Sequence, residues 1–406
     1  MAQASTAEQM NTRGRSLAVR RVTLTDYRNY GSLRFDVPNN ARLLAFAGPN
    51  GAGKTNLLEA VSYLSAGRGL RAAKLAEVAR FGGSGTWAVA AELEGAEGEV
   101  SIGTGLTSER MTAGDGDDED MEFGRAADRR VVRVNGAPVT GPAALAEHMS
   151  MMWLTPKMDR LFVEAGSSRR RFLDRMVIAL HPDHGRQLGA YERGMRERMR
   201  LLTDVSRKAD PVWLSALERR MADHGVAVAA ARVDVLMQLA AHVEDQPENA
   251  FPKADLALEG GLEAGLASRS ALEVEEDFAQ RLAELRGYDA RTGRASEGPH
   301  RTDLLVRHRA KDMPAPLCST GEQKALLIGL VLAHARLMKG LTGTAPVMLM
   351  DEIAAHLDIA RRDALFEALY AMGGQAWLTG TDDHLFDGLG ASALKCDVRD
   401  GAINLC

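Results

Sequence analysis

The chain has 406 residues, of which 45% are hydrophobic and 26% are charged, and its formal net charge is −5. This length exceeds what one hydrophobic core usually serves, and the composition excludes a disordered or fibrous protein. The longest run without a charged residue, 368–381, is too short and too polar to span a membrane, and residues 1–16 lack the apolar core of a secretion signal. Cys318, Cys396 and Cys406 have no disulfide or metal spacing. We expect a cytoplasmic protein of two or three units that does not cross a membrane.

The first part of the chain has the short, alternating apolar segments that are typical of β-strands. Strands are expected at 17–24, 33–37, 42–47, 86–93 and 100–103, and a hairpin at 131–139 that turns at Asn135-Gly136. Six acidic residues lie between Asp115 and Glu122, within a Gly-rich stretch at about 108–130. Because this stretch cannot form a core, we expect a mobile hairpin tip there.

The period becomes helical from Ser167 to about Ala241, with breaks at Pro182 and Pro211. A strand is expected at 256–258, a helix at 271–285 and a second alternating, sheet-like region at 303–317. The chain is therefore expected to run from sheet through a helical arm to sheet.

A phosphate-binding pattern, G-x-x-x-x-G-K-T, follows the strand at 42–47 and precedes a helix at 56–64. Its glycines let backbone N–H groups turn toward an anion, and the helix start adds partial positive charge. We expect Lys54 to reach the β- and γ-phosphates of ATP and Thr55 to hold Mg²⁺. The expected nucleotide contacts are Gly48, Pro49, Asn50, Gly51, Ala52, Gly53, Lys54, Thr55 and Asn56.

The apolar run 347–350 ends in Asp351 and Glu352, where a Walker B motif places its metal ligand and its water-orienting carboxylate. A capped helix start would give the same pattern, but the phosphate-binding loop favours Walker B. Asp351 is then expected to hold Mg²⁺. Glu352, with Lys54 and Asp351, is expected to serve catalysis of ATP hydrolysis.

Cys318 to Lys324 precede an apolar helix at 325–338, about 30 residues before Asp351. Ser319 and Glu322 have the spacing of a simple capping box. In ABC-type ATPases, however, a Ser-x-Gly-x-Gln segment at this point caps the γ-phosphate bound to the opposite subunit through a serine and a helix start. Ser319 and Gly321 are therefore expected nucleotide contacts, and Asp358 follows Walker B as a D-loop residue does.

The spacing of these motifs indicates which subclass of ABC-type ATPase the chain belongs to. About 265 residues separate Lys54 from Ser319, whereas transporter ATPase subunits have a much shorter interval. We expect an α/β protein with mixed sheets: an ABC-type ATPase head split by an inserted helical arm. The expected boundaries are a flexible tail at 1–16, head at 17–165, arm at 166–294 and head again at 295–406.

The chain resembles the RecF family of bacterial DNA repair proteins, which are ABC-type ATPases related to SMC proteins. The resemblance covers about 17–403 and rests on four segments: L-T-D-Y-R-N-Y at 24–30, a block from Thr155-Pro156 to R-R-R-F-L-D at 169–174, G-P-H-R-T-D-L at 298–304 and T-G-T-D at 379–382. Thr302 and Glu322 depart from it, since the family more often has Asp and Gln there. The carboxylate of Glu322 would repel a nearby phosphate unless it faces away.

The resemblance implies a protein of recombinational repair and replication restart that binds ATP and both single- and double-stranded DNA. It also implies a homodimer that forms when ATP is bound, and partnership with RecR and RecO in loading RecA onto single-stranded gaps. Another SMC-like ATPase or an ABC transporter ATPase subunit is the alternative. An SMC clamp needs much longer arms, because each leg here has at most about 35 residues, or roughly 50 Å at about 1.5 Å per residue.

Two sets of arginines are candidates for DNA contact. Arg68 and Arg71 follow the helix after the phosphate-binding loop, where related SMC heads contact nucleotide or DNA; two surface arginines are the simpler explanation. The segment 166–208 has eleven Lys and Arg against five Asp and Glu, and Arg193, Arg196 and Arg200 in it would share one helix face. A solvated helix face is the alternative there.

Overall fold

The computed structural model describes residues 17–406 except 96–97, 108–129, 205–208, 246–249 and 391–392. The chain forms two compact units, one up to Pro156 and again from Lys339, and the other from Lys157 to Met338. The chain leaves the first unit once and later returns to it, so the second unit is an insertion. The expected tail 1–16 and all of the acidic segment except Arg130 lie outside the described residues.

An antiparallel sheet forms the first layer of the first unit. Within the described residues its strand order is β2 (Tyr30–Asp36), β1 (Ala18–Tyr27), β4 (Trp87–Gly95), β5 (Gly98–Leu106), β6 (Arg130–Val134) and β7 (Ala137–Val139). The alternating pattern predicted this sheet, since β4 buries every second side chain from Trp87 to Leu93. The predicted hairpin turn is confirmed, because Asn135 and Gly136 have φ angles of 48° and 79°.

A mostly parallel sheet forms the second layer of this unit. Within the described residues its order is β15 (Ala402–Leu405), β14 (Leu394–Arg399), β3 (Leu43–Ala47), β13 (Ala376–Gly380), β12 (Val347–Met350) and β8 (Met151–Leu154). All pairs are parallel except β14 with β15. Every residue of β3, β12 and β13 is buried, as expected for a sheet covered on both faces. The carboxyl ends of these three neighbouring strands therefore share one sheet edge.

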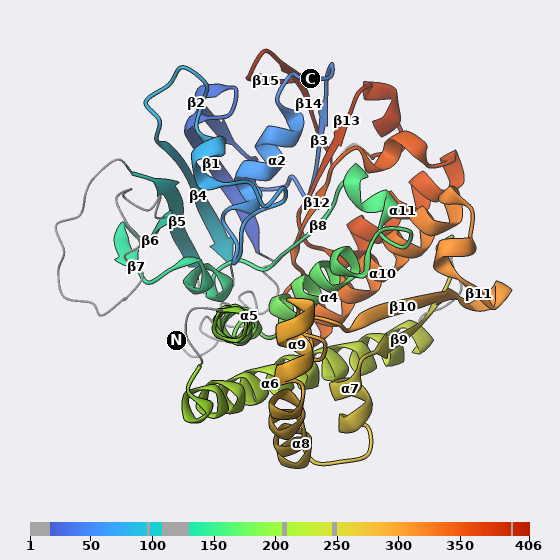
Figure 1. Ribbon diagram of the computed structural model, residues 1–406. Helices are drawn as coiled ribbons and strands as arrows, with labels where there is room; N and C mark the ends of the chain where they lie inside the picture. The colour runs from blue at the N-terminus through green and yellow to red at the C-terminus, as the bar shows by residue number, and fades with distance from the viewer. Residues whose placement is uncertain (1–16, 96–97, 108–129, 205–208, 246–249, 391–392) are drawn as a thin grey trace, which may run out of the picture. The chain divides into compact units, whose positions relative to one another are not determined.

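Helix α2 (Lys54–Ser62) contacts β1 of the antiparallel sheet and β13 of the parallel sheet (Figure 1). It buries Leu57, Leu58 and Val61 between the layers. The remaining helices of this unit are α3 (Leu75–Val78), α11 (Ile359–Met372) and the 3-10 helices η1 (Pro142–Glu147), η5 (Ile353–His356) and η6 (Asp383–Phe386).

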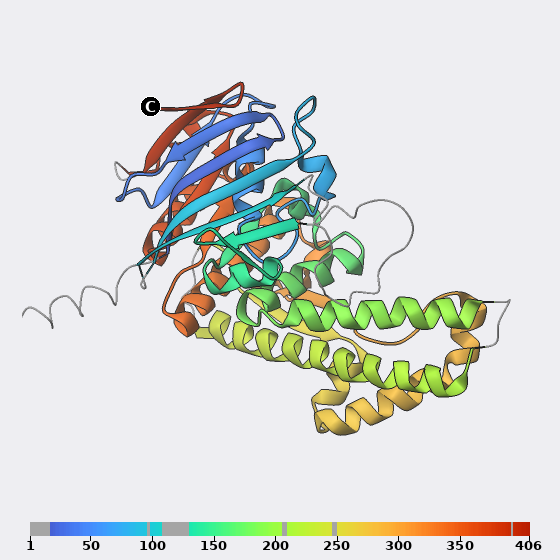
Figure 2. The ribbon, with the colours of Figure 1, turned by 90° about the vertical axis from the view of Figure 1, so that its left-hand side faces the viewer.

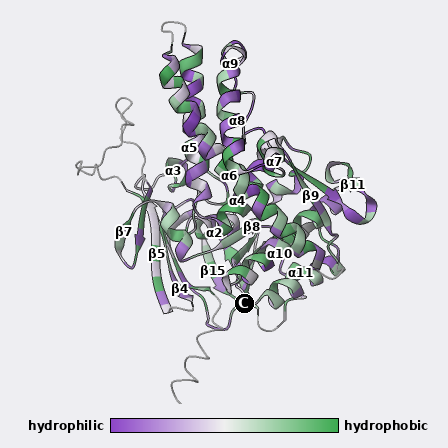
Figure 3. Ribbon diagram, turned by 90° about the horizontal axis from the view of Figure 1, so that it is seen from below, coloured by the Kyte–Doolittle hydropathy of each residue, from purple (hydrophilic) through white to green (hydrophobic). Residues whose placement is uncertain are grey.

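The second unit is mainly helical. Its helices are α4 (Gly166–Leu180), α5 (His184–Thr203), α6 (Pro211–Asp245), α7 (Gly261–Leu266), α8 (Ala271–Glu284), α9 (Arg286–Thr292), α10 (Thr320–Thr342) and the 3-10 helices η2 (Pro156–Arg160), η3 (Arg309–Lys311) and η4 (Ala315–Leu317). Helices α5 and α6 run side by side (Figure 2). Apolar and polar residues alternate along α5 and α8 (Figure 3), and the apolar faces meet in a core around Tyr191, Met221 and Phe278.

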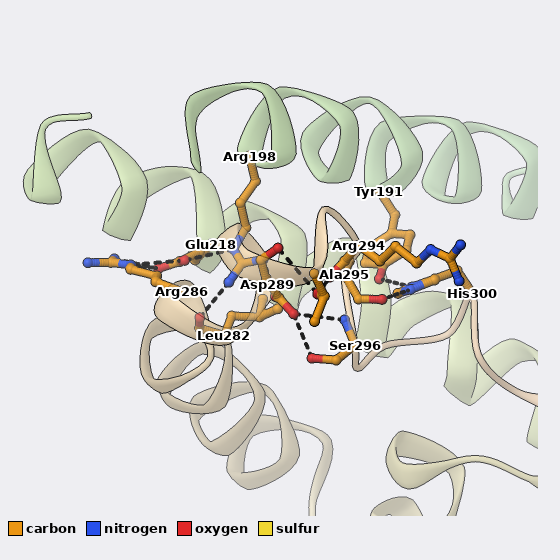
Figure 4. A network of polar contacts seen from close by, with 11 residues as sticks. Tyr191, Arg198, Glu218, Leu282, Arg286, Asp289, Arg294, Ala295, Ser296 and His300 are labelled. Carbon is orange, nitrogen blue, oxygen red and sulfur yellow. Dashed lines mark hydrogen bonds and ion pairs between the residues drawn. The ribbon is translucent and has the colours of Figure 1, made fainter. Parts of the chain in front are cut away.

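A buried polar network ties α5, α6, α8 and α9 together (Figure 4). The fully buried guanidinium of Arg198 donates to Glu218 at 2.8 Å, to Asp289 at 2.7 Å and to the Leu282 carbonyl at 2.6 Å. Arg286 also pairs with Glu218. Removing one member of such a network leaves a buried charge unpaired, which typically costs about 3–5 kcal/mol. The network therefore fixes how these helices pack.

The boundaries between the two units lie at 156/157 and 338/339, whereas 165/166 and 294/295 were expected. Strand β10 (Asp303–His308), expected in the head, pairs with β9 (Ala254–Glu259) in a sheet of order β11 (Met313–Pro314), β10, β9 among the described residues. Asp303 also receives two hydrogen bonds from Arg169, at 2.7 and 2.5 Å. Residues 295–338 belong to the inserted unit, and these interactions hold β10 in it. The sheet-like stretch 303–317 is also less regular than expected, because 3-10 turns interrupt it at 309–311 and 315–317.

Two helices in the described part of the chain, α6 and α10, are long and apolar enough by composition to cross a membrane. Of the most apolar 18-residue stretch of each helix, 67% is buried inside the protein in α10 and 44% in α6. Core helices of soluble proteins pass the same test, so these helices are weak grounds for a membrane span.

Candidate nucleotide site

The phosphate-binding loop connects β3 to α2, as its sequence predicted. Gly48 and Gly53 have φ angles of 151° and 116°, which residues other than glycine rarely adopt. A Cβ at Gly48 would lie 2.2 Å from the Val398 carbonyl oxygen, and one at Gly53 would lie 2.6 Å from the side-chain nitrogen Nδ2 of Asn29. Backbone geometry therefore favours glycine at both positions, and contact with a backbone carbonyl also requires it at Gly48.

The ammonium group of Lys54 lies inside this loop. It donates to the carbonyl oxygens of Gly48 at 2.6 Å and Pro49 at 2.9 Å, and the residue is 4% exposed. Burial lowers the pKa of Lys54, while the carboxylates of Glu352 and Asp351 act in the opposite direction. A buried cation facing a Gly-rich loop is suited to an anionic ligand.

The two Walker motifs meet through Thr55 and Asp351. The Thr55 hydroxyl donates to the Asp351 carboxylate at 2.8 Å, although 296 positions separate them along the chain. Thr379 donates to the same carboxylate oxygen at 2.8 Å and accepts the Glu352 backbone N–H at 2.9 Å. Burial raises the pKa of Asp351, which the hydrogen bonds from Thr55 and Thr379 oppose. Sheet order explains why Thr55 and Asp351 meet. Only one strand, β13, lies between β3 and β12, so the segments that follow these two strands lie close together.

The donor set fits a magnesium ion. A hydroxyl and a carboxylate, both hard oxygen ligands, are already adjacent, and Mg²⁺ is usually held by one or two such groups together with substrate phosphates. Among the described residues no cluster of three or more His, Cys, Asp or Glu is placed to hold a metal by itself.

Asn29 and Tyr30 brace the loop, a role that the sequence did not assign to them. The amide of Asn29 donates to the Ala52 carbonyl at 3.2 Å, and the Tyr30 hydroxyl donates to the Gly53 carbonyl at 3.0 Å. Asn56 donates to the side-chain oxygen of Asn29 at 2.8 Å. The only signal was their place in the L-T-D-Y-R-N-Y segment, which resembled a family signature without indicating a contact.

Arg71 is part of an ion-pair network. The buried carboxylate of Glu59 accepts two hydrogen bonds from Arg28, at 2.8 and 2.7 Å, and one from Arg71 at 3.0 Å. Arg71 also donates to the Asn56 side chain at 2.8 Å. Arg68 is exposed. The structure therefore gives Arg71 a bracing contact next to the loop and presents Arg68 to solvent.

The signature segment lies in the second unit, at the start of α10. Ser319 and Glu322 form the capping box: the Ser319 hydroxyl and backbone N–H donate to the Glu322 carboxylate at 2.9 and 3.0 Å. Lys311 pairs with Glu322 and lowers the pKa of that carboxyl to about 2. Ser319 and Gly321 are exposed. In the first unit, Asp358 caps α11 by accepting the Arg361 N–H at 2.8 Å.

The arginines proposed on the arm share a helix face. Arg193, Arg196 and Arg200 are all exposed on α5, and Arg196 lies 3.9 Å from the Glu192 carboxylate. His300 is partly buried and contacts the Tyr191 hydroxyl at 2.7 Å and the Ala295 carbonyl at 3.0 Å (Figure 4), so it has a structural role in the arm.

Comparison with known proteins gives consistent matches. Residues 18–387 match the RecF/RecN/SMC N-terminal domain. The chain is 50% identical to the DNA replication and repair protein RecF of Mesorhizobium japonicum, over 95% of this chain and 97% of that protein. It is 47% identical to RecF of Rhizobium etli, over 95% and 98% of the two chains.

Solved structures show the same fold. The structure of the recombination mediator protein RecF with ATP, from the RecFOR pathway, matches with a TM-score of 0.81 and 21% identity, covering 96% of this chain and 98% of that one. An Smc head domain of Pyrococcus furiosus with an extended coiled coil matches with a TM-score of 0.50 and 15% identity, covering 96% of each chain. The expected α/β head with a helical insertion is thus confirmed, and the chain belongs to the RecF family, the ABC-type ATPases related to SMC proteins.

Proposed function

We propose that this protein binds and hydrolyses ATP with Mg²⁺ and acts in DNA replication and repair. The observation that carries the proposal is the 2.8 Å hydrogen bond between Thr55 and Asp351, which joins the phosphate-binding loop to the Walker B strand in one site. The names of relatives 47–50% identical to this chain support the role in replication and repair.

The side chains divide the chemistry among them. Lys54 neutralises charge on the β- and γ-phosphates, while backbone N–H groups of residues 50–56 bind phosphate oxygens. Thr55 and Asp351 hold Mg²⁺, which when bound neutralises phosphate charge and orients the nucleotide. Glu352 follows the metal ligand and is partly exposed, so it orients or deprotonates the attacking water.

The ATP-bound form is proposed to be a homodimer in which Ser319 and Gly321 of one copy cap the nucleotide of the other. Asp358 would lie near the same composite site. By family resemblance, the dimer acts in the cytoplasm on single- and double-stranded DNA and helps RecO and RecR to load RecA. The test is the mass of the protein in solution. We expect a monomer without nucleotide and a dimer with Mg²⁺ and ATP, and a mass that does not respond to ATP would refute the dimer.

Ser319→Arg is expected to leave ATP binding by the monomer unchanged and to block dimerisation. The new side chain places a long cation at an exposed helix start whose partial charge is already positive. Light scattering with ATP measures dimerisation, and titration with a fluorescent nucleotide measures binding. Thr320→Arg, one position further on an equally exposed residue, is the matched control. Normal dimerisation of Ser319→Arg would exclude capping in trans by this serine.

The joint replacement of Arg193, Arg196 and Arg200 by Ala is expected to weaken DNA binding irrespective of sequence. A contact that neutralises phosphate releases counterions, so each lost contact flattens the slope of log K against log salt by roughly 0.9. The slope should fall by up to about 3, as measured by fluorescence anisotropy at several salt concentrations.

The control for this variant removes three other arginines, two exposed and one partly buried, that are each paired with a carboxylate in the same unit. Arg269, Arg281 and Arg307 pair with Asp277, Glu297 and Asp312. Their replacement changes the net charge equally, so it separates a local DNA contact from a general charge effect. Equal slopes for both triple variants would show that the α5 face is only solvated.

A further inference from the structure

Thr379 occupies a special position in the parallel sheet. It lies near the carboxyl end of β13, which pairs with β3 on one side and with β12 on the other. Strand β3 leads into the phosphate-binding loop, and β12 leads into Asp351 and Glu352. The carboxyl edge of a parallel sheet is where ligand sites form in open α/β folds. A side chain at the end of the middle strand can therefore reach both Walker motifs.

The hydroxyl of Thr379 makes two directed contacts at this edge. Its O–H donates to the same Asp351 oxygen that accepts from Thr55, and its oxygen accepts the Glu352 N–H. The residue is fully buried. A hydroxyl can donate one hydrogen bond and accept others, which these two contacts require together; neither a methyl group nor a carboxylate could make both.

We propose that Thr379 is a positioning residue of the ATPase site, an inference that rests on the hydrolytic function proposed above. It holds the Asp351 carboxylate toward Thr55 and sets the direction in which the Glu352 side chain leaves the backbone. It acts only through these two residues and does not itself contact nucleotide.

Backbone geometry gives Glu352 a particular need for such support. Its φ angle of 50° lies in the left-handed region, which costs a residue with a side chain of order 1–2 kcal/mol. The preceding N–H, of Asp351, is held by the Leu154 carbonyl at 2.9 Å, and that of Glu352 is held by Thr379. Together the two bonds keep the strained turn in place, so loss of one would let the Glu352 carboxylate take other directions.

Thr379→Val and Thr379→Ser separate the hydroxyl from the packing, since valine keeps the shape and serine keeps the O–H. For Thr379→Val we expect kcat to fall about 10–100-fold while KM for ATP changes less than about threefold, because a misdirected base slows the chemical step. Thr379→Ser should recover kcat to within about threefold of the parent. Thr104→Val is the matched control, because Thr104 is also a buried strand residue whose hydroxyl bonds a carbonyl, that of Val131.

Two further measurements test the role of Thr379: the effect of Mg²⁺ on ATP affinity, and turnover in a double variant. The affinity for ATP with Mg²⁺, divided by the affinity in EDTA, should fall several-fold in Thr379→Val and stay unchanged in Thr104→Val. In the Glu352→Gln background, Thr379→Val should reduce kcat by less than about threefold, because a residue that acts through Glu352 has little left to position.

The outcomes distinguish this inference from the function on which it rests. One outcome is that Glu352→Gln is slow while Thr379→Val equals Thr104→Val in kcat and in the effect of Mg²⁺ on ATP affinity. This outcome would overturn the role of Thr379 and leave the ATPase proposal intact. Full additivity in the double variant together with an unchanged Mg²⁺ effect, or a failure of serine to restore kcat, would likewise show that Thr379 only stabilises the fold. Unchanged turnover in Glu352→Gln would instead contradict the proposed function itself.

Discussion

Lys54→Met is expected to weaken ATP binding by at least about 100-fold, because a charge-assisted hydrogen bond to a phosphate is worth up to about 3 kcal/mol and Lys54 can make more than one. Methionine keeps much of the length and apolar volume of the lysine stem, so the buried loop should still pack. Isothermal titration with ATP measures the loss. Dimerisation in ATP should disappear with it.

The controls for this variant address folding and charge. Lys74→Met removes an exposed lysine from the same unit and should bind ATP as the parent does. The thermal midpoint of Lys54→Met without nucleotide should be at least that of the parent, since the lysine is buried there and its ammonium is held only by two carbonyls. ATP affinity within about threefold of the parent would remove Lys54 from the nucleotide site.

Glu352→Gln is expected to bind ATP normally and to hydrolyse it at least about 100-fold more slowly, since general-base catalysis typically contributes that much or more. The proposed metal ligand Asp351 and its bonds to Thr55 and Thr379 remain, so affinity for ATP should be spared. Because the variant cannot leave the ATP state, it should accumulate as a dimer. Phosphate release measures turnover, and light scattering measures the dimer.

Glu367→Gln on α11 makes the same chemical change at an exposed position of the same unit and should turn over like the parent. Asp351→Asn should differ from Glu352→Gln by losing the Mg²⁺-dependent part of ATP affinity. If Glu352→Gln releases phosphate at the rate of the parent, the water is activated by another group. These two carboxylates would then need their roles reassigned.

The elements and motifs that depend on neighbouring residues could be predicted from the sequence. The loop Gly48 to Thr55 forms between a strand and a helix, and the turn at Asn135-Gly136 has the expected positive φ angles. Helix breaks fall where Pro182 and Pro211 predicted them. Each of these follows from local rules: glycine tolerates positive φ, proline ends or begins helices, and apolar spacing sets the period.

Contacts between segments that are distant along the chain could not be predicted from the sequence. Strand β10 has the same alternating pattern as a head strand, and only its pairing with β9 places it in the inserted unit. The sequence also could not show that Arg71, a candidate for DNA contact, bonds to Glu59 next to the phosphate-binding loop. Periodicity states which face of a strand is buried but not which strand lies beside it.

Residue type and spacing along the chain were enough to predict the nucleotide-binding loop, the acidic pair Asp351-Glu352 and the split of the head by a helical arm. The bridge that Thr379 makes between Asp351 and the Glu352 backbone, and the contacts of Asn29 and Tyr30 with the loop, could be seen only in the folded chain. A hydrogen bond needs two groups within about 3 Å, and distance in space is not written in residue spacing. Sheet order brings these groups together from positions as far apart as Thr55 and Asp351.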